Sequence, residues 1–564
     1  VDEVGPSFTS SSTATAVAEN TAANTVVYTA AATDSDFNSP ATASSVSYSL
    51  KANTGDATQF SINSATGAVT LTESPNFEAK PGYSFTVVAT DAAGNTAERA
   101  VTLAVSNVND APVLASMSTL GFTENDAATS INTAITVVDL DNPSLASATV
   151  SITAGFESNQ DVLGFVNDGT SMGNIAGSWD SATGVMSLSS SGATATLAQW
   201  QAALRAVKYS NTSDNPTTAA RTVSYVVNDG AASSNVLTST VNVTALNDAP
   251  VLANGSTLAY TENAAAEAIN TAITVADADN ARLASAAVSI SGGFVAGQDV
   301  LGFVADSASM GNIAGTWDSA TGVMSLSSAG ETATLAQWQA ALRAVSYSNT
   351  SDSPNTAART VSYVVNDGTT ASAAVTSSIN VTAVNDAPVL VDTTLVLSAV
   401  SQDAADPSGA VGALVSSLVG GQSDVDSASA PKGIAITGVN ANGTLHYSTN
   451  GGSTWTAVTG ASGTNALLLG SDSDNRIFFK PNAGYYGTLS DAVTFRAWDQ
   501  SSGLEGSYVS TATTGGSSAF STATDTISQQ VVRPVTINTV STDSIVVLNE
   551  AVPLSGTADA NATV

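Results

Sequence analysis

The chain has 564 residues, with 47 acidic and 14 basic side chains, and a net charge of −33. A chain of this length exceeds what one hydrophobic core normally organises, which predicts several domains. The acidic excess argues against nucleic acid as a partner. There is no cysteine, which excludes disulfides and thiolate metal sites.

Only 11% of residues are charged and 43% are hydrophobic, so disorder is not expected. No run of 18 apolar residues occurs, and no membrane span is predicted in this segment. Between 239 and 245, Val241, Val243 and Ala245 alternate with polar residues, which is typical of a half-buried strand. The sequence therefore predicts an all-β protein built as a tandem array of β-sandwiches.

The first element to recur is the turn Ser-Ala-Thr-Gly, which occurs at 64–67, 181–184 and 319–322. Glycine at the end of such a turn favours a hairpin, since it adopts positive φ without strain. We therefore expect the first unit to share its sandwich with the two that follow.

The linker motif Asn-Asp-Ala-Pro recurs with a fixed period. Its aspartates are Asp110, Asp248 and Asp386, so both spacings are 138 residues (248 − 110 and 386 − 248). The stretches 172–187 and 310–325 differ at only one position, and a fixed period of this kind indicates an architecture of repeats. We expect domains at 1–112, 113–250, 251–388 and 389–535, with a partial domain at 536–564.

A short helix is predicted inside the second and third domains. Leu197, Trp200, Leu204 and Val207 fall at spacings of three and four, and Thr196 with Gln199 matches a capping box. The copy spans 334–345. Trp200 and its copy Trp338 are expected to be core anchors rather than ligand platforms.

The fourth domain is a diverged relative that keeps an Asp-x-Asp pair and a Trp-Asp pair at 498–499. Residues 536–564 have room for two or three strands, too few to bury a core. We therefore expect the array to continue beyond either end of this segment, together with its targeting signals.

Acidic residues recur at three places in each predicted repeat: a Glu-Asn pair near the start, an Asp-x-Asp motif some fifteen residues later, and one Asp before a glycine turn near the end. These candidates are Glu19, Glu124 and Glu262; Asp34, Asp36, Asp139, Asp141, Asp277 and Asp279; and Asp91, Asp229 and Asp367. The linkers add Asn109, Asp110, Asn247, Asp248, Asn385 and Asp386, and the fourth domain adds Asp424, Asp426 and Asp499.

These carboxylates predict a Ca²⁺ site at each domain junction. Residues i and i+2 of a strand point to one side, so both aspartates of Asp-x-Asp are expected to face one ion. Many hard oxygen ligands, with a single histidine and no cysteine, favour Ca²⁺ over a transition metal. The alternative is that they are ordinary turn residues, since Asp is common in loops. Their recurrence in phase with the domain boundary favours the cation.

The first unit resembles the cadherin repeat, with its motifs in the family's order. The matching segments are Ala18-Glu19-Asn20, Asp34-Ser35-Asp36, residues 60–72, Pro75-Asn76-Phe77-Glu78, Ala89-Thr90-Asp91 and Asn107-Val108-Asn109-Asp110-Ala111-Pro112. The resemblance implies a Greek-key sandwich of cadherin or immunoglobulin type. It also implies that Glu19, Glu78 and Asp110 bind calcium together with Asn109, Asp139, Asp141 and Asp229.

The match departs from the family at several positions. Asn76 and Asn107 stand where the family has Asp, and Ala111 where it has Asn. The second and third units show no counterpart of the Leu-Asp-Arg-Glu motif to which Glu78 belongs. Fewer or weaker ions per junction than in animal cadherins are therefore expected.

The longer units, with the Gln-Trp helix and the Tyr-Ser-Asn-Thr-Ser-Asp motif at 209–214 and 347–352, resemble tandem repeats of giant bacterial adhesins of the RTX type, exported by type I secretion. The terminal fragment is similar to bacterial immunoglobulin-like repeats. The resemblance implies an extracellular, calcium-stabilised extender of a surface or secreted adhesin that mediates cell adhesion or biofilm attachment.

A self-assembling filament, sheath or surface layer is the alternative, because exposed edge strands permit lateral contact. Partners other than calcium, whether surface ligands, matrix ligands or copies of the chain, stay open. One histidine and no cysteine leave little for nucleophilic or acid–base catalysis, so no enzyme is expected.

Overall fold

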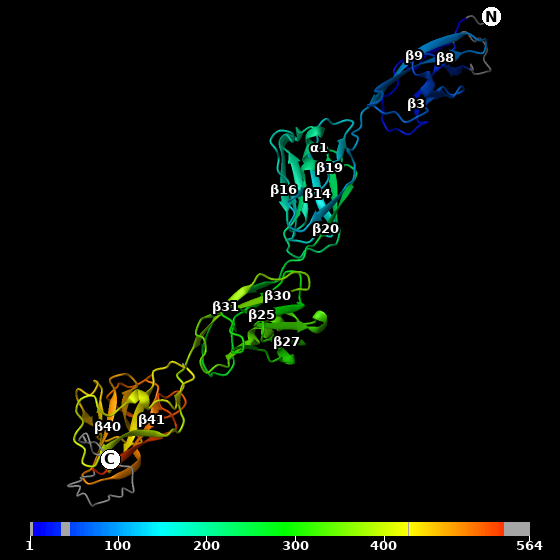
Figure 1. Ribbon diagram of the computed structural model, residues 1–564. Helices are drawn as coiled ribbons and strands as arrows, with labels where there is room; N and C mark the ends of the chain where they lie inside the picture. The colour runs from blue at the N-terminus through cyan, green and yellow to red at the C-terminus, as the bar shows by residue number, and fades with distance from the viewer. Residues whose placement is uncertain (1–3, 35–45, 427, 535–564) are drawn as a thin grey trace, which may run out of the picture. The chain divides into compact units, whose positions relative to one another are not determined.

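The computed structural model describes residues 4–34, 46–426 and 428–534. The chain divides into two compact units, Val1–Asn247 and Asp248–Val564. Each unit contains two β-sandwiches (Figure 1). The predicted partial domain at 536–564 and the candidate ligand Asp36 lie outside the described residues. No helix in the described ranges is long and apolar enough to cross a bilayer.

The first sandwich is built around small apolar side chains of two sheets, and Val69, Val87 and Val101 are fully buried between them. Its four-stranded sheet is β2 (Val17–Ala18), β9 (Thr96–Ser106), β8 (Gly82–Thr90) and β5 (Ser47–Leu50). Its three-stranded sheet is β3 (Val26–Thr29), β7 (Ala68–Leu71) and β6 (Phe60–Ile62), and β1 (Ser7–Phe8) pairs with β4 (Ala32–Thr33).

The second sandwich has a larger sheet, because an inserted hairpin adds two strands to its edge. The six-stranded sheet is β11 (Thr119–Thr123), β20 (Leu237–Thr244), β19 (Arg221–Asn228), β14 (Ser147–Ala154), β17 (Val185–Ser190) and β16 (Ile175–Asp180). The facing sheet is β12 (Thr129–Ser130), β18 (Lys208–Asn211) and β15 (Asp161–Gly164), and β10 (Val113–Ala115) pairs with β13 (Thr136–Val138).

The third sandwich, in the other unit, repeats this topology strand for strand, as the near-identical sequences require. Its large sheet is β22 (Thr257–Thr261), β31 (Val375–Thr382), β30 (Arg359–Asn366), β25 (Ser285–Gly292), β28 (Val323–Ser328) and β27 (Ile313–Asp318). The facing sheet is β23 (Glu267–Ala268), β29 (Ser346–Asn349) and β26 (Asp299–Gly302), and β21 (Val251–Ala253) pairs with β24 (Thr274–Ala276). A short helix, α2 (Ser307–Met310), precedes β27.

The predicted helix is present in both copies, as α1 (Leu197–Ala206) and α3 (Leu335–Ala344), each with its capping box. The indole of Trp200 is fully buried and donates to the Leu145 carbonyl at 2.9 Å. Trp338 does the same with Leu283 at 3.0 Å. Both tryptophans are therefore core anchors, because the one polar atom of each has a buried partner.

The predicted hairpin glycines are confirmed as well. Gly67, Gly184 and Gly322 have φ of 69°, 71° and 73°, which residues with a side chain rarely adopt. The three turns are not equivalent, however. The turn of Gly67 joins β6 to β7 in the three-stranded sheet, whereas those of Gly184 and Gly322 join the two strands of the inserted hairpin at the edge of the large sheet.

The fourth sandwich has its own loops but a comparable pair of sheets. The larger sheet is β33 (Leu395–Ser401), β43 (Asp525–Val532), β41 (Gly487–Trp498), β36 (Gly433–Val439), β39 (Asn465–Gly470) and β42 (Tyr508–Ser510). The second is β34 (Ala413–Leu414), β40 (Arg476–Pro481), β37 (Gly443–Ser448) and β38 (Thr456–Ala457), and β32 (Val389–Leu390) pairs with β35 (Gln422–Ser423).

One pairing places the acidic residues of each sandwich. An early strand of the large sheet runs parallel to the last one, as in β22 beside β31, where Thr261 pairs with Thr382. The residue after the early strand and the linker after the last strand therefore leave the sheet side by side. The same parallel pairing joins β2 to β9 and β11 to β20.

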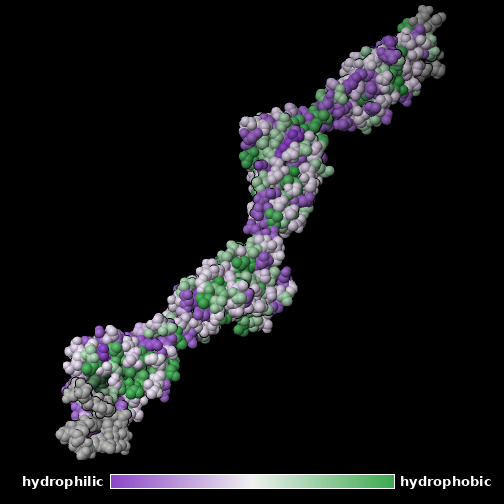
Figure 2. Space-filling model, viewed as in Figure 1, coloured by the Kyte–Doolittle hydropathy of each residue, from purple (hydrophilic) through white to green (hydrophobic). Residues whose placement is uncertain are grey.

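The visible surface is mostly of near-neutral hydropathy, which reflects the many Ser, Thr and Ala side chains of the strands (Figure 2). Only 11% of residues are charged, so a place where several carboxylates lie close together is unusual in this protein.

Candidate metal centres

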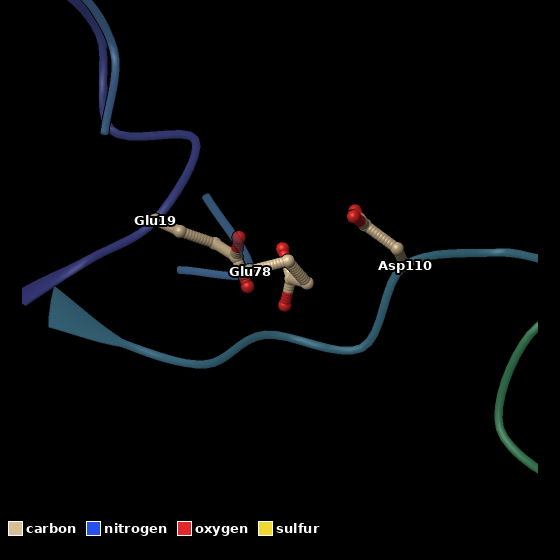
Figure 3. Close-up of side chains that lie close together, drawn as sticks. All are labelled: Glu19, Glu78 and Asp110. Carbon is tan, nitrogen blue, oxygen red and sulfur yellow. The ribbon is translucent and has the colours of Figure 1, made fainter. Parts of the chain in front are cut away.

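The first junction is the linker 107–112 that joins the first two sandwiches within one unit. Glu19, Glu78 and Asp110 each bring a carboxylate oxygen to it, and these oxygens lie within 4.8 Å of one another. In Figure 3, Glu19 and Glu78 adjoin and Asp110 reaches toward them from the linker. The structure thus brings together the three residues that the resemblance selected from the first unit.

Glu19 is held rigidly, although it lies in a turn. Its carboxylate accepts the backbone N–H of Val108 at 2.7 Å and of Phe77 at 2.9 Å, and the side chain is only 3% exposed. The parallel pairing of β2 with β9 explains the first contact, because the turn after β2 meets the linker after β9. One residue therefore ties the linker to the segment that carries Glu78.

The second sandwich contributes carboxylates to the same place. Asp141 accepts the backbone N–H of Asp110. The amide of Asn109 donates to Asp229 at 2.8 Å, and its Oδ1 accepts from Asn142 at 2.9 Å. Of the predicted neighbours, Asp141 and Asp229 contact the linker directly.

The expectation that Asp-x-Asp lies in a strand is wrong. The strand β13 ends at Val138, and Asp139 Oδ1 instead accepts the N–H of Asp141 at 3.0 Å and of Asn142 at 2.7 Å. Asp277 repeats this turn with the N–H of Asp279, and Asp424 repeats it with that of Asp426. The first aspartate therefore shapes the turn that presents the second, which is a common role of Asp in loops.

The third junction, at 383–388 in the other unit, has the same construction. Glu262, Asp352 and Asp386 bring carboxylate oxygens within 4.8 Å of one another. Glu262 is 4% exposed and accepts the N–H of Val384 at 2.7 Å. From the fourth sandwich, Asp426 accepts the N–H of Asp386 at 2.8 Å, and Asp499 accepts the amide of Asn385 at 2.9 Å.

Asp352 was not among the predicted ligands. The longer repeats were expected to have no counterpart of Glu78, yet Asp352 precedes β30 as Glu78 precedes β8, and it joins the cluster that its early Glu begins. The signal was the Asp that closes the repeated Tyr-Ser-Asn-Thr-Ser-Asp motif, which occurs also at Asp214.

Several carboxylate oxygens of these clusters are buried without a hydrogen-bond donor. Among them are Oε1 of Glu124 and Glu262, and Oδ2 of Asp139, Asp277 and Asp386. A buried carboxylate oxygen without a partner is costly, and buried charges normally pair with a cation or a donor. The orphaned oxygens therefore point to an ion.

Burial and repulsion within the clusters together move several pKa values. Burial raises the pKa of Glu262, and the negative charges of Asp386, Asp426 and Asp352 raise it further. The hydrogen bond from the Val384 N–H acts in the opposite direction and lowers it, but it is outweighed. Burial and the charges of Asp426, Asp352 and Asp424 likewise raise the pKa of Asp386.

At the first junction, backbone hydrogen bonds from Val108 and Phe77 lower the pKa of Glu19. A hydrogen bond from its own backbone lowers the pKa of Glu78. Burial, Asp141 and Glu19 outweigh this and raise it to about 7.

The pKa of Glu78 predicts how the calcium-free protein responds to pH. Since the folded value lies above the ordinary 4.5, the group stabilises the fold fully below pH 4.5, and this stabilisation is lost as pH rises through about 7. With a chelator present, the first sandwich should therefore melt at a lower temperature at pH 8 than at pH 5.5 in scanning calorimetry. Glu78→Gln should remove this difference; if the variant keeps it, Glu78 is not the titrating group.

The linker at 245–250 contains the boundary between the two units, which lies between Asn247 and Asp248. In the first unit, Glu124 accepts the N–H of Leu246 at 2.8 Å. In the second unit, Asp279 accepts the N–H of Asp248 at 2.5 Å. Asp367 Oδ1 accepts two N–H groups of its own turn, from Thr369 and Thr370. Asn247, another predicted ligand, lies on the same linker directly before Asp248.

At the other end of the first sandwich, Asp91 is 6% exposed and accepts N–H groups from Ala93 and Asn95, both at 2.9 Å. Asp34 and Asp91 join no group of three acidic ligands within the described ranges.

Comparison with known proteins gives a family for part of the chain. Residues 13–108 match the family model described as the Cadherin domain. No curated protein matches the chain.

Three solved structures illustrate the structural likeness. Protocadherin gamma B2 cadherin domains 1–5 are 16% identical with a TM-score of 0.36, covering 68% of this chain and 61% of that chain. The extracellular domain of protocadherin gamma B4 is 17% identical with a TM-score of 0.35, covering 94% and 68%. Mouse cadherin-23 EC22–24 is 16% identical with a TM-score of 0.33, covering 68% and 100%. The chain thus spans less than two thirds of the first of these.

Proposed function

We propose that this chain is a calcium-stabilised extender, in which Ca²⁺ ions fix successive sandwiches to one another. The observation that carries the proposal is the cluster of Glu262, Asp352 and Asp386, with buried oxygens of Glu262 and Asp386 that have no donor. A second cluster, of Glu19, Glu78 and Asp110, has the same construction.

The donor chemistry favours calcium. The two clusters consist of carboxylates, with the amides of Asn109 and Asn385 on the same linkers, and Ca²⁺ takes six to eight oxygen ligands in flexible geometry. The one histidine, His446, lies on β37 and belongs to neither cluster. Asp426 and Asp499 come from the fourth sandwich, so an ion at the third junction would hold ligands of two sandwiches.

Electrostatics explains how an ion would act. Without it, close carboxylates repel one another, and this repulsion adds to the effect of burial in raising the pKa values of Glu262 and Asp386. A divalent ion turns this repulsion into a bridge. Extracellular calcium modules bind at about 10⁻⁴ to 10⁻³ M, so the junctions would be slack at low calcium and fixed outside the cell.

Cadherin domains are typical of extracellular adhesion proteins, and residues 13–108 match that family. We therefore propose an extracellular role, in a large adhesin that holds a distant binding site away from a bacterial surface. In this proposal the domains end at 112, 250, 388 and 535, and the ligands at each linker are those that the sequence pattern selected, with Asp214 and Asp352 added.

The proposal predicts that calcium changes the stability and dimensions of the whole chain. Millimolar calcium should raise the melting temperature in scanning calorimetry and change the radius of gyration in small-angle scattering, and a chelator should reverse both. Magnesium at the same concentration is the control, because it demands a tighter octahedral site.

Melting and scattering that are the same in calcium and in chelator would refute the extender. Ordered assembly on calcium addition, seen by sedimentation, would instead favour a self-assembling filament or layer.

A further inference from the structure

The segment 350–358, which carries Asp352, has no strand or helix of its own. It connects β29 to β30, and Asp352 is exposed near its start. A ligand on a loose loop must be ordered by the ion, and the backbone entropy lost when those residues are fixed weakens ion binding. What holds this loop therefore decides how tightly the junction binds.

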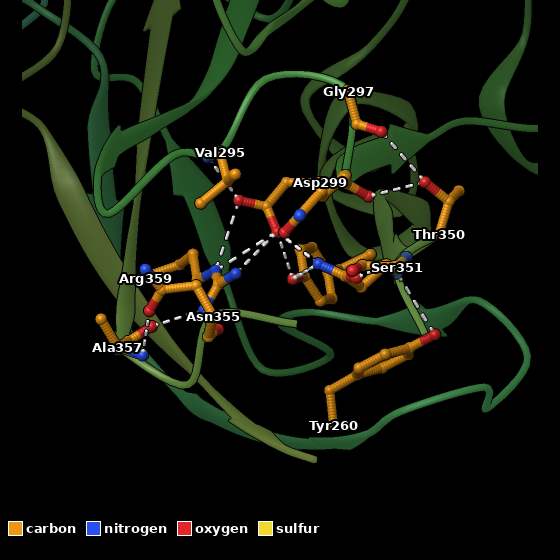
Figure 4. A network of polar contacts seen from close by, with 12 residues as sticks. Tyr260, Val295, Gly297, Asp299, Thr350, Ser351, Asn355, Ala357 and Arg359 are labelled. Atoms are coloured by element: carbon orange, nitrogen blue, oxygen red, sulfur yellow. Dashed lines mark hydrogen bonds and ion pairs between the residues drawn. The ribbon is translucent and has the colours of Figure 1, made fainter. Parts of the chain in front are cut away.

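A buried ion pair contacts the loop (Figure 4). Arg359 and Asp299 are both 0% exposed, and the guanidinium contacts the carboxylate at 3.1–3.3 Å. Asp299 also accepts from Tyr347 at 2.6 Å, from Asn349 at 2.8 Å and from the N–H of Val295 at 2.8 Å. Every oxygen of the buried carboxylate is therefore satisfied.

The pair holds the loop at both of its ends. Arg359 Nη1 donates to the carbonyl of Asn355 and to that of Ala357 at 2.6 Å, which fixes the segment after Asp352. Before Asp352, Asn349 is bound to Asp299 and accepts the N–H of Ser351 at 2.9 Å.

The Thr350 N–H donates to the Gln298 carbonyl at 2.9 Å. The hydroxyl of Thr350 donates to the Gly297 carbonyl at 3.2 Å. The loop is thus bound to the turn that leads into Asp299 as well as to Asp299 itself.

Tyr260 connects this network to a second ligand. It is fully buried on β22, two residues before Glu262, and its hydroxyl accepts the N–H of Asn349 at 3.3 Å. The same hydroxyl donates to the Ala264 carbonyl at 2.7 Å, across the turn that holds Glu262. The segments that carry Glu262 and Asp352 are therefore joined inside the sandwich.

We propose that the buried Asp299–Arg359 pair is the positioning element of the calcium ligand Asp352, so that the loop is ordered by the core before any ion binds. This inference rests on the proposed function, because it concerns the same junction. The second sandwich repeats the pair with Asp161 and Arg221, where Arg221 Nη1 donates to the Thr217 and Ala219 carbonyls at 2.5 Å. That pair would position Asp214.

The first sandwich holds its corresponding ligand by a different device. Glu78 is followed by Lys80, whose ammonium pairs with Asp56, and these side chains are 41% and 20% exposed. Dissolved salt screens the attraction within a partly exposed pair of this kind, whereas it has little effect on the fully buried Asp299–Arg359 pair. The two kinds of ligand loop therefore differ in what secures them.

The test uses Arg359→Lys in the full chain. Lysine keeps the charge beside Asp299 but has a single ammonium, so it cannot also reach both carbonyls of the loop. Hydrogen exchange is followed by mass spectrometry across a calcium titration, in peptides that cover 260–264, 349–358 and 383–390. We expect the calcium midpoint of these peptides to rise about 10-fold or more, as for loss of a group that orients a metal ligand.

Two features separate positioning from a general loss of structure. In saturating calcium, exchange protection of β25 and β30 should match that of the parent chain. Arg343→Lys is the matched control. Arg343 lies on helix α3 and donates to the Ile273 carbonyl, and it has no hydrogen bond to Asp299 or to the loop. It should leave the midpoint unchanged.

Thr350→Val covers the case in which Arg359→Lys does not fold. It leaves the ion pair intact and removes the hydroxyl bond to the Gly297 carbonyl, and it should raise the midpoint by a smaller factor. An unchanged midpoint in the folded variants overturns the positioning role while the calcium site stands. Absence of any calcium-dependent protection in the parent chain overturns the calcium site itself.

Discussion

Arg359→Met is expected to lower the free energy of unfolding of the third sandwich by about 3–5 kcal/mol. Methionine is similar in length, but it leaves the Asp299 carboxylate buried at 0% exposure without its cation. It also leaves the carbonyls of Asn355 and Ala357 without their donor. A buried charge that loses its partner is far more costly than an exposed one.

Hydrogen exchange of the full chain measures this change, in peptides from β25 and β30. The second sandwich is the control inside the same molecule, because its Asp161–Arg221 pair is untouched and its protection should not change. Asp299→Leu combined with Arg359→Met should recover much of the loss, since removing both charges leaves none unpaired. A loss below about 1 kcal/mol for the single variant would contradict the account of a tightly coupled buried pair.

Glu262→Gln is expected to have opposite effects with and without calcium. The glutamine oxygen can still accept the N–H of Val384, so the main change is the loss of one negative charge from the cluster. With a chelator, the third junction should become more stable, because the charges of Asp386, Asp426 and Asp352 no longer oppose a carboxylate. With calcium, affinity at this junction should fall by at least about 10-fold, as a charged ligand is lost.

Calorimetry in chelator and in millimolar calcium measures both effects: the melting temperature of the variant should be higher than that of the parent chain in chelator, and the stabilisation by calcium should be smaller. Glu267→Gln is the control, because it removes one exposed carboxylate from the same sandwich outside the cluster. If Glu262→Gln lowers stability equally in both conditions, the residue is a structural hydrogen-bond acceptor and not a calcium ligand.

Sequence patterns predict the local structure of this protein well. The α1 helix follows from the spacing of Trp200 and Leu204 and from its capping box, and the hairpin of Gly184 follows from a turn that only glycine adopts easily. Both depend on residues within a few positions of one another. Because the sequence repeats after 138 residues, each helix or hairpin predicted in the second unit is also predicted at the equivalent position of the third.

The cluster at the linkers was predictable in part. Recurrence selected Glu262 and Asp386, but Asp352 lies in a loop whose path depends on contacts with residues far away in the chain. Asp139 shows a different limit: the i, i+2 spacing suits a strand and an Asp turn equally, and the end of β13 at Val138 decides between them.

The buried pairs were not predicted, although Arg221 and Arg359 occupy equivalent positions, 138 residues apart, in the two repeats (359 − 221). Sixty residues separate each arginine from its aspartate, so no local pattern joins them. A sign was present in the composition: the chain has only 14 basic residues, and each of these two begins a strand of alternating apolar residues. An arginine on the buried side of such a strand requires a buried partner.

The parallel pairing of β22 with β31 has a mechanical consequence for the third sandwich. One strand lies near the start of the domain and the other at its end, and they run in the same direction over five paired positions. A force that pulls the two ends of the domain apart therefore slides these strands past each other, and their hydrogen bonds resist shear together instead of opening one after another. Each sandwich with this pairing would resist tension along the chain, as a tether under load requires.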